Sequence, residues 1–211
     1  MNFVIAIDGH AASGKGTIAR AISKCFGFSY LDTGLIYRAL SKIALSKSKA
    51  PLSTKELVKI ARSFSSEFLK LKNLRSDEVG TYASKIAAIP EVRRELSRFQ
   101  RNFALESEGA VLDGRDIGTV IFPDAQLKFF ITADLEIRAE RRYQELLKWD
   151  RLVNFQKVRS DLSKRDHLDS SRRHAPLKIS KDAYLIDTSE LSIETAVAQV
   201  TTLVKKALEK N

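Results

Sequence analysis

The sequence predicts an α/β fold in which short buried strands alternate with helices. One reason is the apolar run at 3–7, which passes directly into a glycine-rich loop and then into a helical pattern. A second is the run at 110–113, which is short and ends in an acid, as a central parallel strand does. The length of 211 residues suits one such domain with insertions and a substantial core.

The loop that follows the first strand spans residues 9–17 and reads GHAASGKGT. Gly9 and Gly14 let the backbone turn tightly, so that successive N–H groups and the helix N-terminus point at phosphate oxygens. Lys15 adds a positive charge for the β- and γ-phosphates. The phosphate-binding residues are therefore expected to be Gly9, His10, Ala11, Ala12, Ser13, Gly14, Lys15, Gly16 and Thr17.

The end of this loop narrows the class of enzyme. Gly16 stands directly after the lysine and the hydroxyl follows at Thr17, an order that resembles the nucleoside monophosphate kinases. In those enzymes the loop holds the phosphates of ATP. The guanine-reading pattern Asn-Lys-x-Asp is absent from the sequence, which excludes a GTPase.

The elements after the loop helix can be taken in order. A second strand is predicted at 28–31, and Thr33 is the expected N-cap of the next helix. Residues 47–51 break the pattern, and Ser53 with Glu56 forms a capping box that starts another helix.

The middle of the chain continues with a polar loop at 70–77 and a helical spacing at 77–89. Pro90 opens a further helix at its first position. The turn at 114–116 leaves the carboxyl end of the strand at 110–113, where open α/β sheets bind their ligands. The remaining elements are expected as a strand at 127–132, a charged helix at 135–147, a break at 149–154, a helix from about 155, a strand at 183–187 and an amphipathic helix at 193–208.

Composition limits the surroundings and the partners. Cys25 is the single cysteine, which rules out an internal disulfide and a cysteine metal cluster. No apolar stretch of membrane length occurs, and the first strand starts at Phe3, so we expect no signal peptide, no membrane partner and a cytoplasmic monomer. The formal charge of +10 suits nucleotides or nucleic acid and does not choose between them.

Three further motifs occur in a fixed order along the chain. They are Asp32-Thr33-Gly34-x-x-Tyr37-Arg38, the block from Asp113-Gly114-Arg115-Asp116 to Phe122-Pro123-Asp124-Ala125, and Arg165-Asp166 through Asp169 and Arg172 to Ala175-Pro176-Leu177. Together with the loop they resemble the bacterial cytidylate kinases over nearly the whole chain. This resemblance implies a P-loop kinase fold with a five-stranded parallel sheet, and ATP-dependent phosphorylation of CMP and dCMP with Mg²⁺.

The resemblance also implies a division of the chain and a set of roles. The core would be 1–46, 108–144 and 166–211, the nucleotide-binding insert about 47–107 and the mobile lid about 145–165. CMP would be bound by Thr33, Arg38, Ser84, Arg93, Arg115, Asp116, Arg165, Asp169 and Arg172, with Ser84, Arg93 and Asp116 reading cytosine. Lys15, Arg115 and Arg165 would be catalytic, Arg141 and Arg142 would contact ATP, and Asp113 is our candidate for the acid near Mg²⁺.

The chain departs from the family pattern at two loop positions and in the insert. His10 stands where the family usually has proline, and Ala12 where it usually has glycine. The insert is shorter than in most bacterial members and lacks their strand signals.

Other interpretations of these residues remain open at the level of sequence. Arg38 and Arg115 could form surface salt bridges, Arg141 and Arg142 could lie on a solvated helix face, and Asp113 could cap a turn. The alternative functions are a P-loop kinase for another nucleotide or for shikimate, and a basic nucleic-acid-binding module that uses ATP as a ligand. We do not expect a nucleic-acid partner, because the sequence lacks interleaved aromatic and basic residues.

Overall fold

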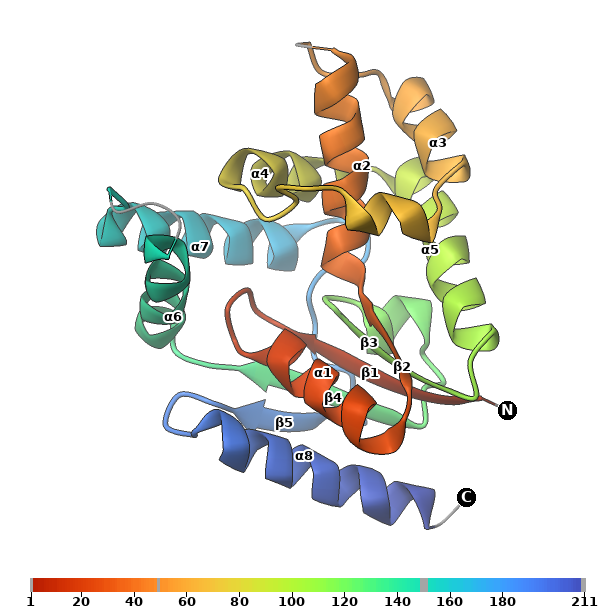
Figure 1. Ribbon diagram of the computed structural model, residues 1–211, viewed down its shortest axis with the longest axis vertical. Helices are drawn as coiled ribbons and strands as arrows, with labels where there is room; N and C mark the ends of the chain where they lie inside the picture. Colours follow the sequence, from red (N-terminus) through yellow and green to blue (C-terminus); the bar gives the residue numbers. More distant parts are fainter. Residues whose placement is uncertain (1, 49, 149–151, 210–211) are drawn as a thin grey trace.

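The computed structural model describes residues 2–48, 50–148 and 152–209. Within these residues five strands form one sheet in the order β2-β3-β1-β4-β5, and every pairing is parallel (Figure 1). The strands are β1 (Phe3–Gly9), β2 (Ser29–Asp32), β3 (Gly109–Gly114), β4 (Leu127–Thr132) and β5 (Tyr184–Asp187). The predicted α/β fold with a five-stranded parallel sheet is confirmed.

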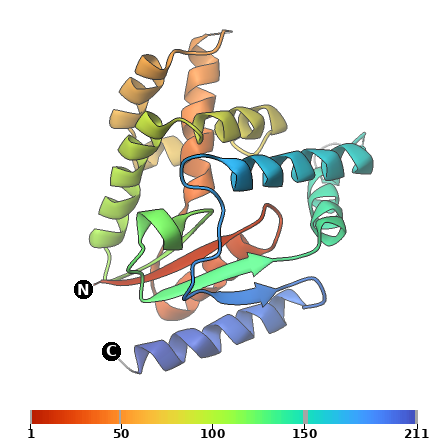
Figure 2. The ribbon, with the colours of Figure 1, turned by 180° about the vertical axis from the view of Figure 1, so that it is seen from behind.

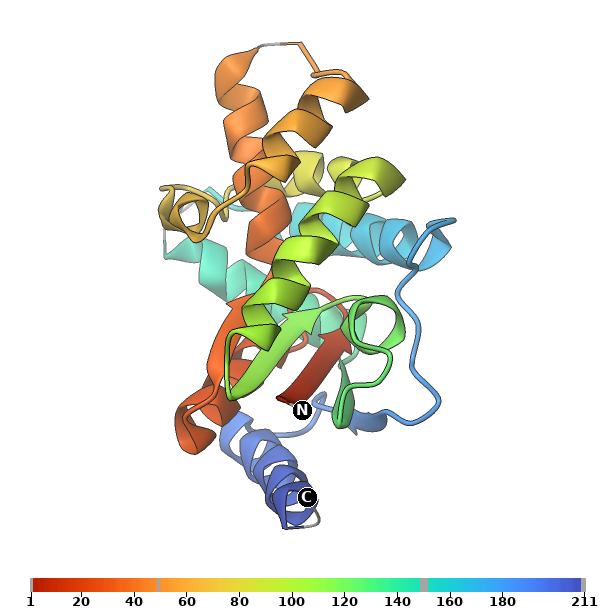
Figure 3. The same ribbon diagram turned by 90° about the vertical axis from the view of Figure 1, so that its right-hand side faces the viewer.

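Helices cover both faces of the sheet and extend past one of its edges (Figures 1 and 3). They are α1 (Lys15–Phe26), α2 (Thr33–Lys47), α3 (Thr54–Arg62), α4 (Asp77–Ile86), α5 (Pro90–Leu105), α6 (Leu135–Leu147), α7 (Phe155–Ser171) and α8 (Ile193–Leu208), with a short 3₁₀-helix η1 (Ser66–Lys70) and a π-helical turn η2 (Ile117–Ile121). None of the described helices is both long and apolar enough to cross a membrane.

The central strand β1 shows how the two faces are divided. Ile5 and Ile7 pack with α1 and α8 in one core, whereas Val4 and Ala6 pack in a second core with α2, α4 and α5. The division follows from the strand period of two, because successive side chains point to opposite faces. Burial of both faces leaves the carboxyl ends of the strands as the edge that is open to a ligand.

The described part of the region between α2 and β3 consists of helices joined by loops, and it forms a layer beside the sheet (Figure 2). Its apolar side chains, among them Leu57, Phe64, Ala83 and Leu96, belong to the same core as α2. The insert therefore packs on α2 and has no strand of its own in residues 50–107, as its lack of strand signals led us to expect.

Most local predictions agree with the structure to within a few residues, and the predicted N-cap of α2 is wrong by one residue. Ser53 and Glu56 form the expected capping box at α3, and Pro90 occupies the first turn of α5. The N-cap of α2 is Asp32 and not Thr33, because the Asp32 carboxylate accepts from Leu35 N at 3.2 Å. The Thr33 hydroxyl instead donates to Asp113 O at 2.8 Å and ties α2 to β3. Part of the predicted break at 149–154 and of the predicted lid lies outside the described residues, at 149–151.

Candidate active site

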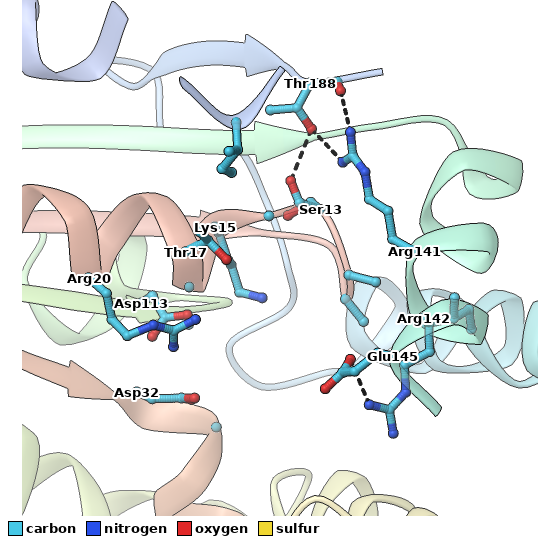
Figure 4. A pocket seen from close by; sticks show the side chains of 18 of the residues that line it. Ser13, Lys15, Thr17, Arg20, Asp32, Asp113, Arg141, Arg142, Glu145 and Thr188 are labelled. Carbon is cyan, nitrogen blue, oxygen red and sulfur yellow. Dashed lines mark hydrogen bonds and ion pairs between the residues drawn. The ribbon is translucent and has the colours of Figure 1, made fainter. Parts of the chain in front are cut away.

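A cleft of about 570 Å³ lies at the carboxyl ends of the strands, between the loop after β1, the start of α2, and helices α6 and α7. Many of its side chains are charged, and the basic ones outnumber the acidic ones (Figure 4). The Lys15 ammonium points into the open cleft, with Asp113 and Arg20 on one side and Arg142 and Glu145 on the other (Figure 4). A cleft lined in this way is suited to a charged ligand.

The floor of the cleft is the loop between β1 and α1, whose backbone requires glycine at two positions. A side chain on Gly9 would come within 2.0 Å of Ile131 O, and Gly14 is the left-handed N-cap of α1 with φ of 87°. Ala12 also has a positive φ, of 60°, which strains a residue that carries a Cβ. The loop therefore keeps the shape of a phosphate cradle with an alanine in a conformation that glycine adopts more easily.

Two polar groups of this loop are weakly bonded within the described part of the protein. The Ser13 hydroxyl is buried and has no hydrogen-bond partner among the described residues. Lys15 Nζ donates only a long hydrogen bond, of 3.3 Å, to His10 O. Burial, and then the charge of Arg115, lower the pKa of Lys15 to about 7. An anion bound beside Lys15 would favour its charged form and raise that pKa.

His10, at the start of the loop, makes an aromatic contact with β4. Its ring lies edge-on to Phe130 at 5.7 Å, and Nδ1 lies 3.3 Å from Thr132 Oγ1. Burial lowers the pKa of His10, and the nearby cations Arg138, Arg115 and Lys15 lower it further, against the opposing charge of Asp166. His10 is therefore neutral at pH 7, and its ring packs against β4.

Two aspartates lie side by side where β2 and β3 end. Asp32 and Asp113 are register partners, and Tyr30 donates to Asp113 Oδ1 at 3.0 Å. Burial, and then the charge of Asp32, raise the pKa of Asp113 to about 6. A cation at this point would relieve the repulsion between the two carboxylates. Asp113 Oδ2 lies beside Gly16 at the start of α1, so it faces the phosphate cradle.

Cations from three parts of the chain meet across the cleft, and we call Lys15, Arg38 and Arg165 the cationic cluster. Arg38 donates to Leu74 O at 2.9 Å. Arg165 Nε is buried and has no hydrogen-bond partner within the described part of the chain. Burial and neighbouring arginines lower the pKa of Arg38 to about 10 and that of Arg165 to about 9.

Deeper in the site two arginines are fully paired, and we call Arg93 and Arg115 the paired arginines. Arg93 is buried on α5 and forms a close ion pair with Asp116. Arg115 Nε donates to Asp169 Oδ2 on α7 at 2.8 Å. Burial opposes the charge on each guanidinium, but these partners outweigh it and raise the pKa of Arg93 and of Arg115.

Asp169 is the point where α7 joins the paired arginines. Asp169 also lies close to a second arginine, because Arg172 Nη2 is 3.7 Å from Asp169 Oδ1. Burial raises the pKa of Asp169, but Arg115, Arg165 and Arg172 reverse this effect and lower it. The Ser84 hydroxyl donates to Gly80 O within its own helix α4 and not to the paired arginines or their carboxylates.

Helix α6 contributes arginines that link the cleft to two other segments. Arg141 donates to Thr188 Oγ1 at 3.0 Å and to Thr188 O at 2.7 Å, and Thr188 in turn donates to Ser13 O. Arg142 pairs with Glu145 at 2.9 Å and with Asp77 at the start of α4 at 3.2 Å. The two side chains thus connect α6 to the loop after β5 and to the insert.

The structure brings together most of the residues predicted from the sequence. The cleft is lined by Ala11, Ala12, Ser13, Gly14, Lys15, Gly16, Thr17, Arg38, Asp113, Arg115, Arg141, Arg142 and Arg165. The other predicted residues are placed behind this lining or beside it, namely Gly9, His10, Thr33, Ser84, Arg93, Asp116, Asp169 and Arg172.

Sequence reasoning did not single out five polar residues of the lining, Arg20, Arg75, Glu145, Thr188 and Ser192. Arg20 could have been found from helical spacing, since it lies four residues after Gly16 on α1 and therefore on the same face of the helix. Arg75 lies in an irregular loop and reaches Asp32 Oδ2 at 3.1 Å. No pattern in the sequence predicts that contact, because it depends on how the insert folds back over β2.

Comparisons with solved structures agree with this architecture. A gluconokinase from Sinorhizobium meliloti has a TM-score of 0.50 at 11% identity, with 96% of this chain and 95% of that chain covered. A shikimate kinase from Bacteroides thetaiotaomicron has the same score and identity, with 96% and 98% covered. At such low identity the likeness shows the fold alone, which is that of P-loop kinases.

Comparisons of sequence are more specific. A cytidylate kinase from Bartonella bacilliformis is 48% identical over 202 residues, covering 96% of this chain and 94% of the relative. A cytidylate kinase from Sinorhizobium medicae is 47% identical over 211 residues, covering 100% and 99%. The family model described as cytidylate kinase matches residues 5–206. With the phosphate cradle, the cationic cluster and the paired arginines in one cleft, the chain belongs to the cytidylate kinase family.

Proposed function

We propose that this chain transfers the γ-phosphoryl group of ATP to CMP and dCMP, forming CDP and dCDP. The name that the relatives carry supports the acceptor, because the similarity covers nearly the full length of both chains. The observation that carries the proposal is the cationic cluster, Lys15, Arg38 and Arg165, facing one cleft with lowered pKa values. Two polyanionic nucleotides supply the negative charge that this cluster lacks.

On the donor side the loop after β1 would hold the phosphates of ATP. Backbone N–H groups at the start of α1 and the Ser13 hydroxyl would donate to the phosphate oxygens, since that hydroxyl has no hydrogen-bond partner among the described residues. Lys15 would bind the β- and γ-phosphates as a point charge. Arg141 and Arg142 would contact the same nucleotide from α6, since both line the cleft opposite the loop.

On the acceptor side the phosphate of CMP would be bound by Thr33, Arg38, Arg115 and Arg165, with Arg172 close by. Planar guanidinium groups can bind phosphate oxygens in a bidentate manner. Ser84, Arg93 and Asp116 would read the base. A carboxylate accepts from the exocyclic amine of cytosine, while uracil presents a carbonyl there and would leave Asp116 without a donor.

The reaction needs no general base. A phosphomonoester has a second pKa of about 6, so an oxygen of the CMP phosphate is already an anionic nucleophile at pH 7. That oxygen attacks the γ-phosphorus, the bond to the β-phosphate oxygen breaks, and ADP leaves. Lys15, Arg115 and Arg165 would reduce the repulsion between the two nucleotides, align them and stabilise the charge on the transferred group.

The site also suits Mg²⁺, which prefers oxygen ligands and retains several waters. The adjacent carboxylates of Asp32 and Asp113 fit such a cation, since burial, and then the repulsion between them, raise the pKa of Asp113. We propose that Asp113 holds the ion through water. When bound, Mg²⁺ would neutralise charge on the phosphates of ATP.

Two segments would close over the substrates, the lid at about 145–165 and the insert at about 47–107. Arg142 supports this proposal, because it reaches from α6 to Asp77 in the insert. Closure would exclude water from the cleft and prevent hydrolysis of ATP.

A coupled assay of ADP release tests the function across the acceptors CMP, dCMP, UMP, AMP and shikimate. We expect CMP and dCMP to be used in clear preference to the others. Equal use of all the nucleotides, or a preference for shikimate, would instead indicate a P-loop kinase for another acceptor. RNA binding that falls steeply with salt, without turnover that depends on CMP, would indicate a nucleic-acid-binding protein.

A further inference from the structure

Asp8 is a buried carboxylate that has no role in the proposed binding of ATP or of CMP. It is 5% exposed and lies in β1, one residue before the phosphate cradle. Burial raises the pKa of Asp8 to about 7, although two backbone hydrogen bonds lower it. A buried charge is costly, so its partners indicate what it does.

The partners of Asp8 are backbone N–H groups in the turn after β3. Ile117 N donates to Oδ1 and Gly118 N donates to Oδ2, both at 2.8 Å. These groups directly follow Arg115 and Asp116, which are assigned to the phosphate and the base of CMP. The register places Asp8 opposite Gly114, the last residue of β3, so the carboxylate spans the turn from its base to its first helical residues.

Other side chains hold the far end of the same turn. Arg101 on α5 donates to Ile121 O at 3.0 Å and to Val120 O at 3.2 Å. Lys128 on β4 donates to Pro123 O. The turn is therefore fixed from three directions, and Asp8 is the support closest to Arg115 and Asp116.

The position of Asp8 at the end of β1 matters because this strand end contacts both parts of the site. Gly9 starts the phosphate cradle for ATP, while the neighbouring carboxylate holds the turn that binds CMP. One rigid strand thus sets the distance between the donor loop and the acceptor turn. In-line transfer depends on that distance, and small misplacements of the reacting groups cost rate.

We propose that Asp8 is a positioning residue that fixes Arg115 and Asp116 relative to the phosphate cradle, and so controls both the use of CMP and its selection over UMP. This inference rests on the proposed function. Asp8 acts through the turn and does not touch either nucleotide. Its loss is therefore expected to affect the acceptor more than ATP.

The test compares Asp8→Asn with the wild type in steady-state assays on CMP and UMP, and measures ATP affinity by calorimetry. An amide can accept at only one of its two heavy atoms, so one of the two N–H groups loses its partner. We expect KM for CMP to rise by roughly ten- to a hundredfold, the CMP-to-UMP ratio of kcat/KM to narrow, and Kd for ATP to change less than about twofold.

Glu95→Gln is the matched control, because it also removes the charge of a buried carboxylate with two hydrogen-bonded partners, Arg62 and Arg98. We expect it to lower the melting temperature and leave the CMP-to-UMP ratio unchanged. If Asp8→Asn behaves in the same way, its role is only structural and the proposal is wrong. A loss of ATP affinity equal to the loss for CMP would contradict it as well.

Arg101→Met covers the case in which Asp8→Asn does not fold. It releases the far end of the same turn from an exposed position, so a smaller change in the same direction is expected for KM and for the CMP-to-UMP ratio. No change in either quantity would overturn the proposal. Failure of the wild type to phosphorylate CMP would refute the proposed function itself, and that result is obtained before any variant is made.

Discussion

Arg93 and Lys15 lie in one site but in opposite electrostatic surroundings. Arg93 is buried against Asp116, and its partners raise its pKa above the ordinary value. Among the described residues, the Lys15 ammonium donates a hydrogen bond only to His10 O, and burial, and then the charge of Arg115, lower its pKa to about 7. Arg115 resembles Arg93, since Asp169 raises its pKa, whereas Arg165 resembles Lys15, since its pKa is lowered to about 9.

This difference indicates what each side of the cleft is prepared to bind. The paired arginines are already held in place by carboxylates, so Arg93 would present a fixed geometry to the base and Arg115 a fixed geometry to the CMP phosphate. The cationic cluster repels itself and gains most from a ligand with several negative charges. Preorganised geometry thus supplies specificity on one side, and uncompensated positive charge supplies affinity for phosphate on the other.

The comparison is tested most severely by Lys15→Met. We expect kcat to fall by about a hundred- to a thousandfold, because the charge on the β- and γ-phosphates is lost. The melting temperature should not fall, since a cation with a lowered pKa does not stabilise the fold. Lys24→Met, on the exposed end of the same helix, should leave kcat unchanged. A kcat that barely changes in Lys15→Met would remove Lys15 from the phosphates.

Arg165→Gln tests whether the cationic cluster lowers the free energy of unfolding while it raises kcat. Because the pKa of Arg165 is lowered in the folded protein, its charged form destabilises the fold below about pH 9, and this effect is relieved at higher pH. We expect the free energy of unfolding at pH 7 to rise and kcat to fall by about a hundredfold. Lys164→Gln, at an exposed neighbouring position, is the control for loss of charge. A less stable Arg165→Gln would contradict this account.

Asp116→Asn tests the paired side. We expect the CMP-to-UMP ratio of kcat/KM to narrow by about tenfold, because the amide can turn its N–H₂ toward a uracil carbonyl. Some stability should also be lost, since Arg93 loses its counter-charge while it remains buried. Asp124→Asn, at an exposed position in the same motif, should change neither quantity. An unchanged ratio in Asp116→Asn would exclude Asp116 from base recognition.

The smallest effect is expected from Ala12→Gly in the phosphate cradle. Ala12 has φ of 60°, so glycine relieves strain there, although it also gains freedom in the unfolded chain. We expect urea unfolding to show stabilisation by up to about 1 kcal/mol. Ala11→Gly should instead destabilise, because the Ala11 methyl packs against α6 and α7. A destabilised Ala12→Gly would mean that the methyl group of Ala12 contributes more packing energy than the strain costs.

Much of the fold could be predicted from the sequence because its signals are local. The strand at 127–132 and the helix at 193–208 agree with β4 and α8 to the residue. The error at Thr33 arose because Asp32 and Thr33 are both good N-caps, and only the approach of β3 decides between them.

The site could be predicted less completely than the fold. Motifs identified the cradle and most of the arginines, since each motif is contiguous in the chain. The contact of Arg75 with Asp32 and the support that Asp8 gives to Ile117 and Gly118 could not be predicted, because they join segments that are distant in sequence.

The central claim is that the cationic cluster lacks negative charge which the nucleotides supply, and proton uptake on binding measures this directly. At pH 8 the phosphates of ATP and CMP are fully ionised, while Lys15, with a pKa of about 7, is mostly neutral in the free protein. Calorimetry of ATP binding in buffers of different ionisation enthalpy should therefore reveal net proton uptake, and Lys15→Met should abolish it. Binding without proton uptake by the wild type, or uptake that persists in Lys15→Met, would contradict the account.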